Sequence, residues 1–376
     1  MIQASSVFDT YINANILLVV AFSLWLTVRF LLNRFGLKNA YTLQLRLLNC
    51  VFLAILLSPF IAFGFNVAAQ NQLLPQGFSI NLSDIALAQF LNGSFEMPAS
   101  DFENVLAMRE TLRTNIMQPT GWFGILIATL ILLGFAGFLT RGTIAALRLK
   151  KIINESYSWR QFGNIRLRLT DKTLVPFSTR GLRNRYIVIP SGMLAQPADL
   201  RITLAHEFQH LRQHDVEWEL GMELFKSLFF WNPVIYFWKH QIEQLRELAC
   251  DQNVLARNRF DVQAYCDCLI RVCQNNLRQD RATAISLPRV ALVQIERPVF
   301  GKDCAALLRQ RILSMIDPGI AAQATPRTLW LMIPLVLGIT VSTIAIQRPS
   351  DWSLDRLMLS SIINLERLEV LNNTSQ

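Results

Sequence analysis

Residues 206–210 read His-Glu-Phe-Gln-His, and this stretch decides how the rest of the chain is interpreted. On an α-helix, positions i and i+4 lie on one face, so the imidazoles of His206 and His210 can reach one metal ion. Glu207 is then placed to act as general base on water at that metal. The pattern predicts a zinc-binding helix in which His206 and His210 are ligands and Glu207 is catalytic.

The third zinc ligand must come from elsewhere, because a catalytic zinc takes three protein ligands and keeps one open position. A metzincin would have a glycine and a histidine where this chain has Gln213 and Val216, so that arrangement is excluded. The gluzincin arrangement needs a glutamate from a later helix. We favour Glu247, and Glu243, one turn earlier, is the rival candidate.

Two aspartates are candidates for orienting the ligand imidazoles. Asp251 lies four residues after Glu247 and shares its helix face, and Asp215 lies close to the end of the zinc-binding helix. A carboxylate that accepts a hydrogen bond from the outer ring nitrogen fixes the tautomer of a ligand histidine. The other two histidines, His214 and His240, are interpreted as surface or interface residues.

The composition is that of a membrane protein. The chain is 52% hydrophobic and 17% charged, whereas soluble domains carry about a quarter charged residues. Each long apolar run approaches the ~20 residues that cross a bilayer as a helix. The first run is interpreted as a retained span, because it is longer than a signal-peptide core and follows no basic segment. The four predicted spans are residues 12–32, 47–69, 122–139 and 328–346.

Basic residues set the predicted orientation. The segments 29–46 and 141–327 hold 31 of the 36 Lys+Arg and 17 of the 27 Asp+Glu. Lys and Arg accumulate on the cytoplasmic side of the bacterial inner membrane. We therefore expect a multi-pass protein of that membrane with both termini outside. The net charge of +9 is explained by this bias and by anionic lipid headgroups, and it requires no nucleic-acid partner.

The predicted domains follow from the spans. They are a membrane region at 1–140 with an extracytoplasmic loop at 70–120, a cytoplasmic domain at 141–327, the fourth span at 328–346 and an extracytoplasmic tail at 347–376. The predicted cytoplasmic domain contains five of the six cysteines and the predicted outside segments contain none, which indicates reduced thiols.

Alternating and β-branched residues predict a small, largely antiparallel sheet, with strands at 164–170, 173–178 and 186–190. The zinc-binding helix is expected to begin near Pro197, with Asp199 as its cap. The apolar stretch 220–238, broken by Asn232-Pro233, is expected to pack against the spans or to lie at the membrane interface.

These motifs together resemble the BlaR/MecR-type membrane metallopeptidases, the antirepressor family of β-lactam sensing. The resemblance covers about residues 1–346 and rests on the sequences HEFQHLRQHD at 206–215, Asn232-Pro233, ELACD at 247–251, VPFS at 175–178 and IVIP at 187–190. It implies an α-helical membrane protein with an α+β gluzincin-type metalloprotease domain, Zn²⁺ as cofactor, and a protein substrate that is a transcriptional repressor or the chain itself.

The best-known members carry a penicillin-binding sensor domain after the last span. Here about 30 residues follow position 346, and they contain no SxxK acylation motif. We therefore expect a chain that lacks this domain. The resemblance favours a membrane-embedded zinc endopeptidase acting in transmembrane signalling. Two alternatives stay open, which are a quality-control protease of the membrane and a non-catalytic signalling scaffold with a structural zinc.

Overall fold

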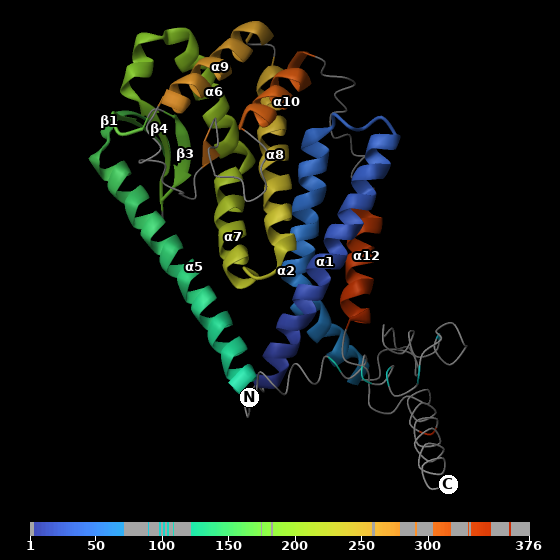
Figure 1. Ribbon diagram of the computed structural model, residues 1–376. Coiled ribbons are helices and arrows are strands. Elements are labelled where there is room, and N and C mark those ends of the chain that lie inside the picture. Colours follow the sequence, from blue (N-terminus) through green and yellow to red (C-terminus); the bar gives the residue numbers. More distant parts are fainter. Residues whose placement is uncertain are drawn as a thin grey trace. The chain divides into compact units, whose positions relative to one another are not determined.

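The computed structural model describes most of the chain in eight ranges (Figure 1). These are residues 4–70, 122–173, 175–181, 183–257, 260–278, 290–291, 304–316 and 332–346, with single positions at 89, 98, 101, 104, 108, 330 and 361. The chain forms two compact units, one made of residues 1–27, 49–132 and 329–376 and the other of residues 28–48 and 133–328. The predicted loop 70–120 and tail 347–376 lie almost entirely outside the described residues.

Among the described residues, three helices are long and apolar enough to cross a membrane. They are α1 (Ala4–Arg34), α2 (Tyr41–Gln70) and α5 (Trp122–Glu155), and their apolar parts are Thr10–Arg34, Tyr41–Phe65 and Ile125–Glu155. Helix α5 continues 15 residues past the predicted domain boundary at 140, because Ala145, Leu149 and Ile152 pack into the core of the following domain. Helix α12 (Met332–Ala345), in the predicted fourth span, has 14 described residues.

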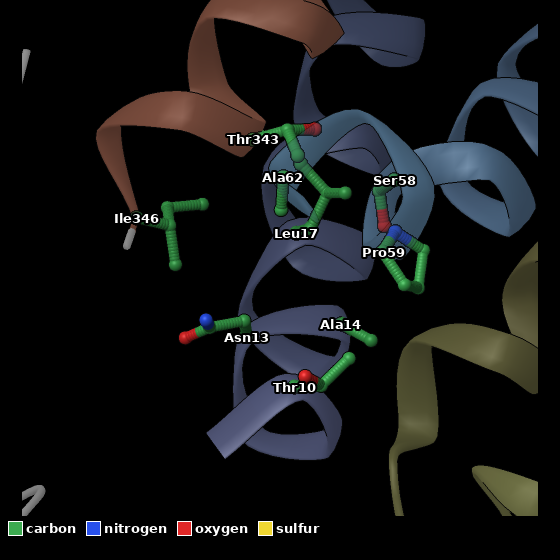
Figure 2. Close-up of a pocket in the computed structure, with 9 residues that line it drawn as sticks. All are labelled: Thr10, Asn13, Ala14, Leu17, Ser58, Pro59, Ala62, Thr343 and Ile346. Carbon is green, nitrogen blue, oxygen red and sulfur yellow. The ribbon is translucent and has the colours of Figure 1, made fainter. Parts of the chain in front are cut away.

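Helices α1, α2 and α12 line a pocket (Figure 2). Its walls come from Thr10, Asn13, Ala14 and Leu17, from Ser58, Pro59 and Ala62, and from Thr343 and Ile346. Pro59 lies inside α2 and removes one backbone donor there. Polar side chains between apolar helices are common at helix–helix contacts in membranes, where they hydrogen-bond across or along the helices. Thr343, for example, donates to the carbonyl of Ile339 at 2.8 Å.

The predicted sheet is present, and within the described residues it has five strands. They are β1 (Tyr157–Phe162), β2 (Ile165–Thr170), β3 (Phe177–Arg180), β4 (Arg185–Pro190) and β5 (Val290–Ala291), in the order β1-β2-β4-β3-β5. Three of the four pairings are antiparallel, as expected, but β2 and β4 run parallel. The parallel pair arises because β3 forms a hairpin on the far side of β4, which leaves the other edge of β4 for β2. Strand β1 was not predicted from the sequence.

The 3₁₀ helix η1 (Ser191–Ala195) and four α-helices build the site region. The α-helices are α6 (Pro197–Gln213), α7 (Asp215–Leu228), α8 (Pro233–Leu255) and α9 (Val262–Arg278), and α10 (Cys304–Ile316) follows later in the chain. Helix α8 begins where the Asn232 side chain accepts from the backbone NH of Val234 at 3.1 Å, with Pro233 in the first turn. The apolar stretch 220–238 therefore belongs to two helices that form the α7–α8 hairpin.

The predicted cap of α6 is wrong. Gln196 occupies the cap position and makes no side-chain cap hydrogen bond, and Asp199 lies inside the first turn. Its two carboxylate oxygens accept from Arg271 of α9 at 2.6 and 2.8 Å. A bidentate arginine competes successfully with the backbone NH groups for this carboxylate, because charge-assisted pairs are the stronger hydrogen bonds.

The turn between α1 and α2 packs against the far end of α8. Gln252 donates to the carbonyl of Asn39 at 3.1 Å, and Asn253 donates to the Thr42 hydroxyl at 3.2 Å. Nearer the middle of α8, Arg29 of α1 donates to Gln241. The last part of α1 and the second half of α8 therefore run alongside each other in the same chain direction.

The core beneath the sheet should dominate the stability of the domain. Ile187 is fully buried in the cluster that β2 and β4 form with α6. We expect Ile187→Ala to cost about 2–5 kcal/mol through lost burial and a residual cavity. Thermal unfolding of the full chain in detergent measures this. The control is Leu194→Ala, whose side chain is 40% exposed, and equal unfolding temperatures for the two variants would contradict the assignment.

Candidate metal centre

Helix α6 brings the two histidines of the motif together, and α8 brings Glu247 to them. The Nε2 atoms of His206 and His210 lie 3.0 Å apart. Glu247 Oε2 is 3.6 Å from the first Nε2, and Oε1 is 3.6 Å from the second. All three residues are 0% exposed. The three predicted ligands therefore converge with their donor atoms on one point.

These separations fit a single zinc ion. Zinc–nitrogen and zinc–oxygen bonds of about 2.0–2.2 Å in a tetrahedron put neighbouring donor atoms about 3.3–3.5 Å apart. The observed values of 3.0, 3.6 and 3.6 Å bracket that distance. Both carboxylate oxygens of Glu247 are buried without a hydrogen bond to any described residue. Arg311 lies 3.0 Å from Oε2 and supplies one compensating charge, and a metal ion between the three donors would supply another.

Asp215 and the left-handed residue His214 together orient the ring of His210. Asp215 Oδ2 accepts from His210 Nδ1 at 2.7 Å. Asp215 reaches back to this ring because His214, between α6 and α7, adopts the left-handed conformation with φ 61° and reverses the chain. A hydrogen on Nδ1 leaves the lone pair on Nε2, which is the atom that faces His206 and Glu247.

His206 is oriented in the same way by a different pair of residues. Its Nδ1 lies 2.8 Å from the hydroxyl of Tyr265 on α9 and 3.3 Å from Asp251 Oδ1 on α8. Tyr265 in turn donates to Asp251 at 2.9 Å. This relay assigns the hydrogen to Nδ1 and the lone pair to Nε2. Two Nε2 lone pairs at 3.0 Å repel each other unless a cation lies between them, so the tautomers also fit a bound metal.

A buried arginine neutralises the acidic side of the centre. Arg311 of α10 is 2% exposed. It donates to both oxygens of Asp251 at 2.7 Å and lies 3.0 Å from Glu247 Oε2. Burial favours the neutral acid, but Arg311 and the two imidazoles outweigh burial and hold the pKa of Glu247 below its usual value. Glu247 is therefore an anion at neutral pH, as a zinc ligand must be.

Glu207 has the environment of a general base. Its carboxylate is 0% exposed, and neither oxygen makes a hydrogen bond to a described residue. Burial raises the pKa of Glu207 above its ordinary value, although His210 and His206 oppose the change. A raised pKa brings a carboxylate closer to the range in which it exchanges protons with water at neutral pH.

Cys250 offers a different third donor. Within the described part of the chain, candidate ligand atoms of His206, His210 and Cys250 lie within 4.8 Å of one another. However, Cys250 Sγ lies 3.5 Å from Nδ1 of His206 and 3.5 Å from its carbonyl oxygen. That is the ring edge already engaged by Tyr265 and Asp251, whereas Glu247 faces both Nε2 atoms. We therefore favour Glu247, and its rival Glu243 lies 3.3 Å from Lys239 instead.

The structure brings all six residues singled out from the sequence into one centre: His206, Glu207, His210, Glu247, Asp251 and Asp215. Sequence reasoning missed Tyr265 and Arg311. Both come from helices after α8, and neither stands at a recognisable motif spacing. His214 was expected at the surface, and its side chain is 59% exposed. The described cysteines Cys266, Cys268 and Cys273 are buried on α9 and form no disulfide with a described residue.

The fold and this centre define an HExxH-type membrane metallopeptidase architecture. The family described as BlaR1 peptidase M56 matches residues 9–297, and the chain belongs to it. The methicillin resistance mecR1 proteins of Staphylococcus aureus (strain Mu50) and Staphylococcus epidermidis are 32% identical to it over 77 residues. That match covers 20% of this chain and 13% of the length of these relatives. Arg311 lies beyond the residues that match the family.

Removing Arg311 should destabilise the protein strongly. Arg311→Met leaves Asp251 and Glu247 as buried anions without their common cation, which costs about 3–5 kcal/mol. The matched control is Arg309→Met, two residues earlier on α10, where the side chain is exposed. Thermal unfolding of both full-length variants in detergent measures the difference. Identical unfolding temperatures would contradict the ion-pair role.

Proposed function

We propose that the protein is a zinc endopeptidase of the bacterial inner membrane that cleaves a cytoplasmic or membrane-proximal protein during transmembrane signalling. One observation carries the proposal, which is the convergence of two imidazole Nε2 atoms and Glu247 beside a buried, unpaired Glu207. The family and the three apolar helices support a membrane peptidase in general. Zinc, the substrate and the orientation are the finer parts of the proposal.

His206, His210 and Glu247 would hold the zinc ion. When bound, zinc polarises a scissile carbonyl and lowers the pKa of water towards ~7. Glu207 takes the proton from the attacking water and later delivers it to the leaving amine. Asp215, Tyr265 and Asp251 keep the two imidazoles in the tautomer that presents Nε2.

The contacts of α8 support a cytoplasmic active site. The α1–α2 turn lies in the basic segment 33–46, which the positive-inside rule assigns to the cytoplasm. Gln252 and Asn253 of α8 hydrogen-bond to Asn39 and Thr42 of this turn. The domain that carries the site would therefore share its side of the membrane, with both termini outside. A cytoplasmic transcriptional repressor is then an accessible substrate.

Strand β5 supports the chain itself as a substrate. Extended substrates bind many proteins by adding a strand to an exposed sheet edge, and α6 packs against β3. Val290 and Ala291 pair antiparallel with Ser178 and Phe177 on that edge of β3. A segment of the chain thus occupies the position that an added substrate strand would take. We propose self-cleavage in the segment that contains β5 as the first step of signalling.

Glu207→Gln should abolish proteolysis and leave zinc bound, because the amide cannot accept the water proton while the ligands are unchanged. A tag at the C-terminus reports self-cleavage on an immunoblot, and elemental analysis of the purified protein reports zinc. We expect a C-terminal fragment from the wild type and intact chain from the variant, with equal zinc in both.

The other two functions give different results in the same strains. Unchanged cleavage by Glu207→Gln would refute the mechanism. Full zinc content in the wild type without turnover of any protein would favour a scaffold with structural zinc. Many misfolded membrane proteins accumulating in the Glu207→Gln strain would favour quality control, whereas a single accumulating repressor supports signalling.

The third ligand can be tested by zinc content alone. Glu247→Gln should lower the zinc content of the purified protein sharply, because it removes an anionic donor. Glu243→Gln, one turn earlier on α8, and Cys250→Ser should retain zinc. Loss of zinc in Cys250→Ser together with full zinc in Glu247→Gln would instead assign the third position to the thiolate.

A further inference from the structure

The α7–α8 hairpin has an apolar surface at the end far from the metal centre. Its large exposed side chains are Leu220 (42%), Leu224 (60%), Leu228 (42%), Trp231 (53%) and Phe237 (41%). The three leucines are spaced four residues apart and therefore share one face of α7. Monomeric soluble proteins rarely expose such a contiguous apolar surface. Figure 1 shows the two helices side by side, joined by the short turn at 229–232.

Helix α5 fixes the depth of the hairpin turn. The Phe230 ring lies 5.5 Å from the ring of Phe138, and a Cβ at Gly134 would overlap it. Phe138 and Gly134 precede Arg141, the first charged residue after the apolar run, by three and seven residues. At 1.5 Å per residue, Phe230 contacts α5 roughly 5–10 Å inside the apolar part of that helix.

Helix α1 gives an independent estimate of the same depth. Arg29, near the end of the first apolar run, donates to Gln241 of α8. Gln252, further along α8, contacts Asn39 beyond the end of α1. The start of α8 therefore points along α1 towards its apolar part, and Pro233 lies eight residues beyond Gln241, or about 12 Å of helix.

The charged side chains in the middle of the hairpin pair with one another, as expected for charges in a medium without water. Between residues 219 and 246, three cations, Lys226, Lys239 and Arg246, balance three anions, Glu219, Glu223 and Glu243. Lys239 is 5% exposed and lies 3.2 Å from Glu219 and 3.3 Å from Glu243, and it also pairs with Glu223. Charged groups within a bilayer face the protein interior and pair with one another in this way.

We propose that the α7–α8 hairpin is inserted into the hydrocarbon of the membrane from the side of the metal centre, with residues 224–237 among the lipid chains. The occupant of its apolar face is the bilayer, because the two contacts with apolar helices place the turn at that depth. The ~5–12 Å of insertion stays within one leaflet of a core ~30 Å thick. The metal centre is then built at the base of a membrane-embedded hairpin.

Buried ion pairs join the inserted part of the hairpin to the metal centre. Arg246 donates to Glu219 at 2.7 Å and lies 4.0 Å from Asp215, which orients His210. Glu219 connects in turn to Lys239. A continuous series of buried ion pairs thus runs from the hairpin to a predicted zinc ligand.

Depth-dependent quenching tests the insertion. Leu224→Cys is labelled with a bimane fluorophore in the full-length protein, which is reconstituted in phosphatidylethanolamine/phosphatidylglycerol liposomes. The quenchers are doxyl-labelled phosphatidylcholine and aqueous iodide, and the unsubstituted protein gives the background from native cysteines. The matched control is Leu194→Cys on η1, a leucine of the same domain that is 40% exposed. Leu228→Cys, whose side chain is 42% exposed in the wild type, replaces Leu224→Cys if the latter does not fold.

Insertion predicts severalfold stronger quenching of the Leu224 label than of the Leu194 label by the lipid-borne doxyl group, and severalfold weaker quenching by iodide. Iodide quenching equal to that of the Leu194 label would overturn the proposal, because the face would then be in water. Resistance to both quenchers would also overturn it, since a second copy of the chain or another protein would then cover the leucines.

Discussion

The structure depends on a buried electrostatic constraint, which is that two imidazole lone pairs and a carboxylate share one small space. His206, His210 and Glu247 have no exposed surface, and their donor atoms are 3.0–3.6 Å apart. Such a group is stable only when a cation joins it and when its outer atoms are held by hydrogen bonds. The packing of α6, α8, α9 and α10 meets both requirements, because it brings the donor atoms together and supplies the hydrogen bonds to their outer atoms.

Each outer hydrogen bond comes from a different part of the chain. Asp215 reaches His210 because the left-handed His214 reverses the chain directly after α6. Tyr265 reaches His206 because α9 packs on α6, and Arg311 reaches Asp251 because α10 packs on α8. The cluster therefore forms only when the helices pack in the tertiary structure. Losing any one of these helices would leave buried charges without partners.

The sequence was informative where the structural rule is local. Helical spacing put the two histidines of α6 on one face and paired Glu247 with Asp251 on α8, and both features hold in the structure. The prediction for Asp199 was wrong because its partner, Arg271, lies 72 residues away and no local pattern reveals it. The parallel pair β2–β4 escaped prediction for the same reason, since strand order is set by packing rather than by alternation.

The sequence by itself predicted the membrane character, the metal-binding pattern on α6 and the candidate ligands, because hydropathy and the 3.6-residue period are properties of short segments. Only the tertiary structure decided which donor atoms converge, that Arg311 and Tyr265 complete the centre, and that β5 occupies the edge of β3. Those outcomes depend on contacts between residues about 40 to more than 100 positions apart. They follow from the packing of helices and strands against one another, and the sequence of a single segment does not specify that packing.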